Sequence, residues 1–211
     1  MLKKIIGFVI VCILLVSCKK EQSQTNTANN RVTPPSVVNY YGLSVGSYWV
    51  YDTYLVDTLN NSSYQNEDSV WIRADTIIRG NTYYIMAGPN FDLPPNPPLR
   101  DSSGWLVNDT GLKMCNNLGD TSIFFTRVDT GTCTITMAMQ PATFSISVPA
   151  GTFSCIDALG TYRFTVAYSH WGNPRYLYNY YTNGVGLVFQ TDFYTVSPNH
   201  LERRLVRYHV N

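Results

Sequence analysis

The residues best suited to recognition chemistry are a run of aromatic side chains late in the sequence. Tyr176, Tyr178 and Tyr180 alternate along one segment, and Tyr168 and Trp171 precede them closely. Alternate residues of a β-strand share a face, so the three tyrosines are expected to form a ladder. An exposed ladder would stack on a sugar, a peptide or a partner surface, whereas a buried one would be core or a cavity wall. We favour burial and keep all five residues as a candidate binding surface.

Other residues capable of catalysis do not form a recognisable set. Asp-Thr-Gly begins at both Asp109 and Asp129, and aspartic proteases use paired carboxylates that share one proton. Two copies so close together in one sheet cannot form two lobes, and Asp and Gly are the residues that hairpin turns favour. The Gly-x-Ser-x-Gly pattern of α/β-hydrolases is absent. We therefore predict no catalytic residues and no enzymatic activity.

Metal-binding and acid–base patterns are equally lacking. The three histidines, His170, His200 and His209, do not have the spacing of zinc ligands, and no C-x-x-C pair occurs. We predict no metal and no cofactor. A hydrolase on a β scaffold stays as an alternative that would need an acid to converge on His170. Paired carboxylates for glycoside hydrolysis could come only from scattered acids: Glu67, Asp68, Asp157 and Glu202.

The composition is typical of an extracytoplasmic β-protein. The chain has 211 residues, of which 45% are hydrophobic and only 14% are charged, against about 25% charged in average soluble proteins. The net charge is +1, and loss of Lys3 and Lys4 with a signal peptide would leave −1 (+1 − 2). This charge excludes the basic surface that nucleic-acid binding requires.

Short alternating segments separated by turn residues predict a single all-β antiparallel domain over residues 37–211. We expect a strongly curved sheet or half-barrel, with a sandwich as the alternative. Tight turns are expected at Arg79-Gly80 and at the two Asp-Thr-Gly triplets, and the proline-rich segment 88–99 is expected to be a surface loop. The expected strands are 45–58, 68–79, 83–87, 105–108, 112–115, 122–128, 133–139, 143–148, 153–158, 162–169, 175–182, 186–194 and 201–210.

Three cysteines lie within the expected domain: Cys115, Cys133 and Cys155. An odd number allows one internal disulfide at most. A Cys133–Cys155 bridge is one alternative. The other, which we favour, is that all three are small buried thiols on strands.

The N-terminus has the three parts of a secretion signal. Lys3 and Lys4 precede an apolar run from Ile5 to Leu14, and Leu15-Val16-Ser17-Cys18 follows. This end resembles the lipobox of bacterial lipoproteins, in which the cysteine sulfur receives a diacylglyceryl group and cleavage leaves that cysteine first. The apolar run of about 13 residues is shorter than the roughly 20 that a transmembrane helix needs.

The lipobox resemblance implies an address and an anchor. Residues 1–17 are expected to be a cleaved signal peptide, and residues 18–36 the lipidated Cys18 with a flexible polar tether. The chain is then expected in the bacterial cell envelope, anchored through lipid to the outer membrane and facing the periplasm or the surface.

Three later segments strengthen the resemblance: Leu43–Tyr51 with Gly46 and Trp49, Val148–Phe153 with Gly151, and Tyr180–Val188. Together they resemble uncharacterised lipoproteins of Bacteroidota that carry G-x-x-W-x-Y, P-A-G-T-F and Y-x-x-G-V-G-x-V segments. The resemblance implies an antiparallel β fold like the open half-barrel of periplasmic lipoprotein carriers, and it brings no catalytic residues.

Because no catalytic set is recognisable, we expect a non-enzymatic role in ligand or partner binding. The expected partner, besides the membrane, is a glycan, a lipid or an envelope protein. A carrier that holds an apolar ligand on the concave face of its sheet is the alternative within this class. From the residues themselves, Gly46 and Gly151 are expected at backbone positions with positive φ or close approach.

Overall fold

The computed structural model describes residues 40–88 and 97–211. Four predicted features lie outside the described residues: the signal peptide, the Cys18 lipidation site, the tether and most of the proline-rich segment 88–99. Two units divide the chain, Met1–Val32 and Thr33–Asn211. All described elements belong to the second unit.

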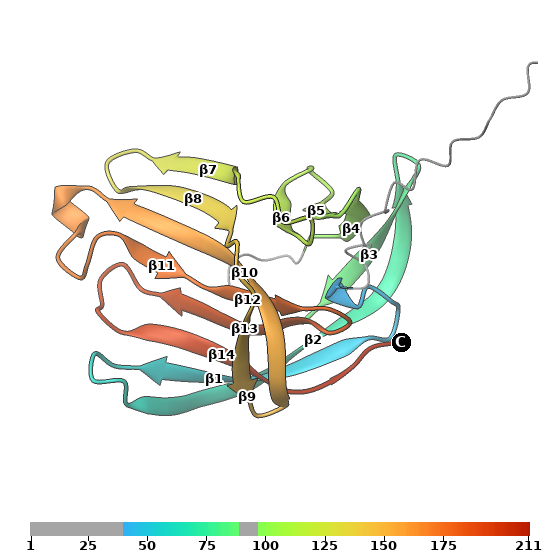
Figure 1. The fold of residues 1–211 in the computed structure, drawn as a ribbon, viewed down its shortest axis with the longest axis horizontal. Coiled ribbons are helices and arrows are strands. Elements are labelled where there is room, and N and C mark those ends of the chain that lie inside the picture. Colours follow the sequence, from blue (N-terminus) through green and yellow to red (C-terminus); the bar gives the residue numbers. More distant parts are fainter. Residues whose placement is uncertain (1–39, 89–96) are drawn as a thin grey trace, which may run out of the picture. The chain divides into compact units, whose positions relative to one another are not determined.

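The second unit consists of fourteen β-strands and one short 3₁₀ turn (Figure 1). The strands of the first half are β1 (Tyr48–Val56), β2 (Ser62–Ile78), β3 (Asn81–Ala87), β4 (Leu99–Ser102), β5 (Trp105–Asn108), β6 (Lys113–Asn116) and β7 (Ile123–Asp129). The second half contains β8 (Cys133–Met139), β9 (Phe144–Val148), β10 (Gly151–Phe164), the 3₁₀ turn η1 (Val166–Tyr168), β11 (Arg175–Leu177), β12 (Asn179–Thr182), β13 (Gly186–Phe193) and β14 (His200–His209).

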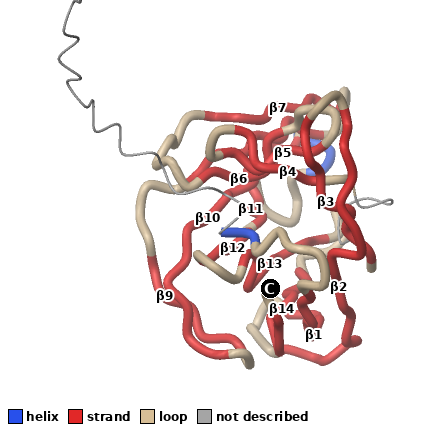
Figure 2. The backbone as a smooth tube through the Cα atoms, turned by 90° about the vertical axis from the view of Figure 1, so that its right-hand side faces the viewer, coloured by secondary structure: helices blue, strands red, loops and turns tan. Residues whose placement is uncertain are grey.

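All strand pairs are antiparallel and belong to one continuous sheet. Its path runs β6-β5-β4-β3-β2-β1-β14-β13-β12-β10-β8-β7, and β9 and β11 add to β10 off this path. Figure 2 shows the sheet curling round until it is nearly closed. The predicted all-β antiparallel domain with a strongly curved sheet is thus confirmed, in its single-sheet form rather than as a sandwich.

Two long strands let the sheet curl, because each changes partner along its length. The first part of β2 pairs with β1 and its last part with β3. The start of β10 pairs with β9, and its end pairs with β8 and β11. A strand that leaves one neighbour and takes another carries the twist of a sheet round a corner.

Several predicted boundaries were wrong. The strand expected at Asp68 begins at Ser62, in an exposed polar stretch that lacks apolar alternation. The strands expected at 153–158 and 162–169 are one strand, and its C-terminal end is followed by η1. Gly160 lies within β10, where a Cβ would come within 3.2 Å of Leu177 Cβ on the paired strand. β4 was missed altogether.

The predicted turns and glycine positions agree with the structure. Each Asp-Thr-Gly triplet lies between paired strands, β5 with β6 and β7 with β8. Gly46 has φ +91° and Gly151 has φ +141°. Both values fall where residues with a Cβ are rarely found, as expected.

The inner face of the sheet carries the main core. We call inner the face that bears Trp49, Tyr51 and Leu205, all almost completely buried. The Trp49 indole N–H donates to the carbonyl of Val185 at 2.5 Å, and the Tyr51 hydroxyl donates to the carbonyl of Leu187 at 2.8 Å. Both bonds tie β1 to β13 or to the turn just before it. The polar groups of the two large side chains therefore have hydrogen-bond partners where they are buried.

A row of polar side chains crosses the same inner face. Asn179, Gln190, Arg203 and Thr53 are direct neighbours on β12, β13, β14 and β1, and all four residues are buried. Since cross-strand partners point to the same side of a sheet, the row lies beside Trp49 and Tyr51 in the interior. The inner face is therefore mainly apolar around Trp49 and Leu205 and polar along this row.

Arg203 brings a full charge into this row, with only 4% of its surface exposed. Its guanidinium pairs with the Asp68 carboxylate, which accepts from Nε at 3.1 and 3.2 Å and also from Nη2. The guanidinium also lies 4.0 Å from the centre of the Tyr51 ring. A paired guanidinium over an aromatic face is the arrangement that makes a buried arginine tolerable.

The three cysteines are buried free thiols. Cys115 and Cys155 belong to the main core, whereas Cys133 belongs to a small separate cluster with Ile135 and Phe164. The Cys133–Cys155 alternative is therefore not realised, and the favoured alternative is. Burial raises the pKa of Cys115 to about 12 and that of Cys155 to about 11, so both are inert thiols at neutral pH.

We expect Asp68→Ala to destabilise the unit Thr33–Asn211 by about 3–5 kcal/mol, because it leaves the buried Arg203 charge without its carboxylate. Urea unfolding measures this loss. The matched control is Glu67→Ala, which removes the adjacent acid, paired with Arg207 at an exposed site. That change should cost less than about 1 kcal/mol, and equal losses in the two variants would contradict the account.

Candidate functional site

An open groove crosses the outer face, which is the face opposite Arg203 and carries its strand neighbours Glu202 and Arg204. The β9–β10 hairpin runs across β12, β13 and β14 here (Figure 1). Its tip is fastened to the sheet by the Ala150 N–H, which donates to the carbonyl of Leu205 at 3.0 Å. The hairpin therefore forms one wall, and the sheet forms the floor.

Two adjoining depressions of about 530 and 450 Å³ make up this groove. They share Ile146, Phe189 and Glu202, so the groove is continuous. We call it the aromatic groove. One end is lined in addition by Ser147, Val148, Pro149 and Arg204. The other end is lined in addition by Arg175, Tyr176, Tyr178, Tyr180, Thr191, Phe193, Pro198 and His200.

The three alternating tyrosines form a ladder along the groove. Ring centres are 6.4 Å apart between Tyr176 and Tyr178 and 5.8 Å apart between Tyr178 and Tyr180. Tyr180 then stacks on Phe189 at 5.1 Å and meets the edge of Phe144 at 4.5 Å. Tyr176 is 44% exposed, whereas the other two tyrosines are half-buried. The ladder is thus a groove wall rather than core or a fully open surface.

Tyr168 and Trp171 do not join this groove. Both lie in the connection between β10 and β11, where they are exposed, and neither is among the groove-lining residues. Trp171 contacts only the ring of the adjacent His170 among the described aromatic pairs. The structure therefore brings together three of the five residues selected from the sequence and leaves two at a separate place.

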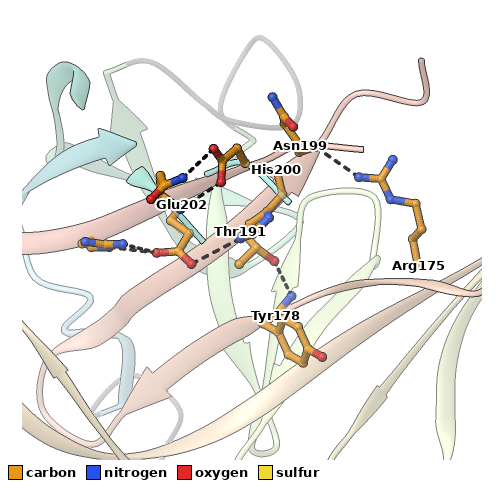
Figure 3. A network of polar contacts seen from close by, with 9 residues as sticks. Arg175, Tyr178, Thr191, Asn199, His200 and Glu202 are labelled. Atoms are coloured by element: carbon orange, nitrogen blue, oxygen red, sulfur yellow. Dashed lines mark hydrogen bonds and ion pairs between the residues drawn. The ribbon is translucent and has the colours of Figure 1, made fainter. Parts of the chain in front are cut away.

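A charged cluster stands where the two depressions meet (Figure 3). One Glu202 oxygen lies 3.3 Å from Nε2 of His200, and the other accepts from Nε of Arg204 at 2.9 Å. Arg204 also lies 4.5 Å above the Tyr54 ring. Sequence reasoning missed this cluster, although the alternation of His200, Glu202 and Arg204 along one strand would have placed them on one face.

Arg175 closes the other end of the groove. Its guanidinium donates to the carbonyls of Tyr194 and Ser197 at 2.9 and 2.8 Å and also to that of Asn199 (Figure 3). It lies 3.9 Å from the centre of the Phe193 ring. This side chain thereby holds the β13–β14 connection against the ladder strand.

Tyr178 interrupts the strand predicted over residues 175–182. Its backbone N–H donates to Oγ1 of Thr191 at 2.9 Å instead of to a backbone carbonyl (Figure 3). The interruption separates β11 from β12 and leaves the Tyr178 ring between its two neighbours in the ladder. A side chain that replaces a ladder bond has no signature in the sequence.

One buried acid lies beside the ladder. Asp157 pairs across the sheet with Tyr180, is 5% exposed, and accepts a hydrogen bond from the backbone N–H of Asn179 at 3.2 Å. Burial raises its pKa to about 7, although the Asn179 bond acts in the opposite direction. Burial, and then the Asp157 charge, raise the pKa of Tyr180 above its ordinary value. The acid is therefore partly protonated near neutral pH.

At the centre of the groove, Glu202 already bonds to both Arg204 and His200, beside the aromatic rings of the ladder. No acid contacts His170 in the described part of the chain. Within residues 40–88 and 97–211, no group of three or more His, Cys, Asp or Glu side chains could hold a metal ion.

In the described part of the chain, no helix has the length and apolar character to cross a bilayer.

Comparisons with known proteins give no family. No protein-family model matches the chain, and no curated protein matches it. One similar solved structure is a Bacteroides fragilis protein with a YmcC-like fold, provisionally described as exported, at 12% identity and a TM-score of 0.47 over 81% of this chain and 98% of that one. Another is a provisionally described lipoprotein from Parabacteroides distasonis, at 16% identity and a TM-score of 0.41 over 81% and 99%.

Neither description states a specific role. With both TM-scores below 0.5, the likeness assigns neither a family nor a ligand to this chain.

We expect Asp157→Asn to stabilise the unit at pH 8 and to flatten its pH dependence. In the wild type, the folded state binds a proton more tightly than the unfolded state, so stability falls as pH rises from about 4 to about 7 and stays lower above that. An amide of the same shape removes this cost, which is about 4 kcal/mol for a shift from 3.8 to about 7.

Urea unfolding at pH 5 and pH 8 checks this expectation. Asp120→Asn serves as the control, because hydrogen bonds from Ser122 hold the pKa of that exposed acid below its ordinary value. It should bring no gain at pH 8. A pH profile of Asp157→Asn that runs parallel to the wild type would show that the carboxyl titrates normally.

Proposed function

We propose that this protein is a non-enzymatic, lipid-anchored binding protein of the bacterial cell envelope whose ligand lies in the aromatic groove. The N-terminal pattern ending at Cys18 supports the anchor, and the resemblance to Bacteroidota lipoproteins supports an outer-membrane address. The single observation that carries the binding role is the tyrosine ladder along an open groove with charged groups at its centre.

The chemical class that fits this groove best is a glycan. The C–H faces of a sugar ring pack on aromatic rings, and its hydroxyls bond to planar charged groups. The groove offers both within reach of each other, with the ladder of Tyr176, Tyr178 and Tyr180 beside Glu202 and Arg204. Its open form suits a chain that passes through rather than a small molecule enclosed on all sides.

The carrier alternative finds less support. A carrier would hold its apolar ligand on the inner face, where Trp49, Val188 and Leu205 are buried at 0–1% exposure. The charged pair of Arg203 and Asp68 occupies the next level of that face. An acyl chain there would have to displace packed side chains and lie against a buried charge.

Glycan binding is testable with soluble linear oligosaccharides of glucose, mannose and N-acetylglucosamine, titrated calorimetrically into residues 33–211. We expect at least one to bind and Tyr178→Ala to weaken binding about tenfold, since one stacked ring is worth on the order of 1 kcal/mol.

Tyr48→Ala is the matched control for the titration. Tyr48 is 39% exposed and also stacks on a neighbouring ring, that of His209, but it lies outside the groove lining. Thermal melting must show that both variants stay folded. The glycan proposal fails if no oligosaccharide binds, or if both variants weaken binding to the same extent.

The anchor is tested by expressing the full precursor in a Gram-negative host. Wild-type protein should fractionate with membranes and show the added mass of acyl chains on Cys18, whereas Cys18→Ser should lack that mass. Cys133→Ser is the control because it removes a buried thiol of the domain. An acylated Cys18→Ser chain, or a wild type without acyl mass, would overturn the lipoprotein assignment.

A further inference from the structure

Four chain connections meet at one end of the sheet. They are residues 57–61, 130–132, 165–174 and 194–199, which join β1 to β2, β7 to β8, β10 to β11 and β13 to β14. Strand register places them together, since Val56 pairs with His200, and Phe164 with Cys133. All four lie at the left in Figure 1. We call this surface the loop end.

Exposed apolar side chains gather on the loop end. Val166 is 92% exposed. The other exposed apolar or aromatic side chains on the connections or their flanking strands are Leu59, Val128, Tyr168, Trp171, Tyr194 and Val196. Single exposed apolar residues need no explanation, but a set supplied at one place by three separate connections and by the end of β7 marks an interaction surface.

The connections of the loop end carry little charge. They contain no Lys or Arg, and their only acid is Asp57; Asp129, Arg127, Arg163 and Arg175 lie on the flanking strands. The Asp57 carboxylate accepts from the backbone N–H groups of Leu59 and Asn61, and Asp129 pairs with Arg127. Little ionic desolvation would therefore oppose contact with an apolar phase.

We propose that the loop end docks on the surface of a lipid bilayer. Valine and leucine at loop tips would enter the acyl boundary, and Trp171, Tyr168 and Tyr194 have the amphipathic rings that favour the headgroup level. The choice of a membrane as partner rests on the lipid anchor proposed above. Because the four connections contain no Lys or Arg, docking depends on apolar burial more than on anionic lipid.

The chain length between anchor and domain permits this contact. Twenty-one residues separate Cys18 from Tyr40, and their full extension spans at most about 75 Å. Ten-residue β14 is only about 33 Å long. Tethering raises the local concentration of the loop end at the bilayer, so a weak contact is sufficient.

Quenching of tryptophan fluorescence by brominated phosphatidylcholine tests the proposal on the full lipidated chain in neutral vesicles. We expect clear quenching in the wild type and at least a threefold smaller effect in Trp171→Phe. Trp71→Phe is the matched control, since Trp71 on β2 is also 42% exposed but lies away from the loop end. It should leave the quenching unchanged.

Val166→Asp and Val196→Asp add charge to the loop tips without touching the core. Together they should lower vesicle binding of the unlipidated Cys18→Ser chain about tenfold, with unchanged thermal melting. This second measurement separates docking from acylation, which is read independently from the mass at Cys18. The proposal would be overturned by any of three results: no quenching in the acylated chain, equal quenching in the two Trp variants, or vesicle binding by the Asp variant that is as strong as that of its parent.

Discussion

The buried charge of Arg203 is the constraint on which the rest of the structure depends. A guanidinium inside a sheet needs a carboxylate, an aromatic face and polar neighbours, and the chain supplies Asp68, Tyr51 and the row from Asn179 to Thr53. These partners come from β1, β2, β12 and β13 on either side of β14. The curled sheet brings them together, so its curvature and the charge compensation are one arrangement.

A filled interior leaves the outer face for the recognition that we propose. With Trp49, Val188 and Leu205 packed at one level and the polar row at the next, the inner face has its space occupied. Alternation along β14 then places Glu202 and Arg204 on the outer face, where the β9–β10 hairpin turns a flat sheet surface into a groove. The loop end is a third surface. Its exposed side chains are mainly apolar, whereas the groove combines aromatic and charged side chains.

The sequence predicted the structure correctly where a local residue pattern alone determines the local backbone. Period-two alternation and Asp-Thr-Gly turns predicted the all-β class and the hairpins, and they placed Tyr176, Tyr178 and Tyr180 on one face. It failed where the cause is tertiary. Nothing local shows that Gly160 continues a strand, that Thr191 interrupts one at Tyr178, or that the β9–β10 hairpin folds over β14. Tyr168 and Trp171 are near the ladder in sequence, but they do not line the groove.

Native mass spectrometry of residues 33–211, purified from a bacterial periplasm, tests most directly whether the interior is filled and recognition lies outside. A packed core and a buried Arg203–Asp68 pair predict the mass of the polypeptide alone, with no lipid retained. A co-purifying mass that dissociates on activation and matches a lipid would contradict this. It would show that the inner face opens to hold an acyl chain.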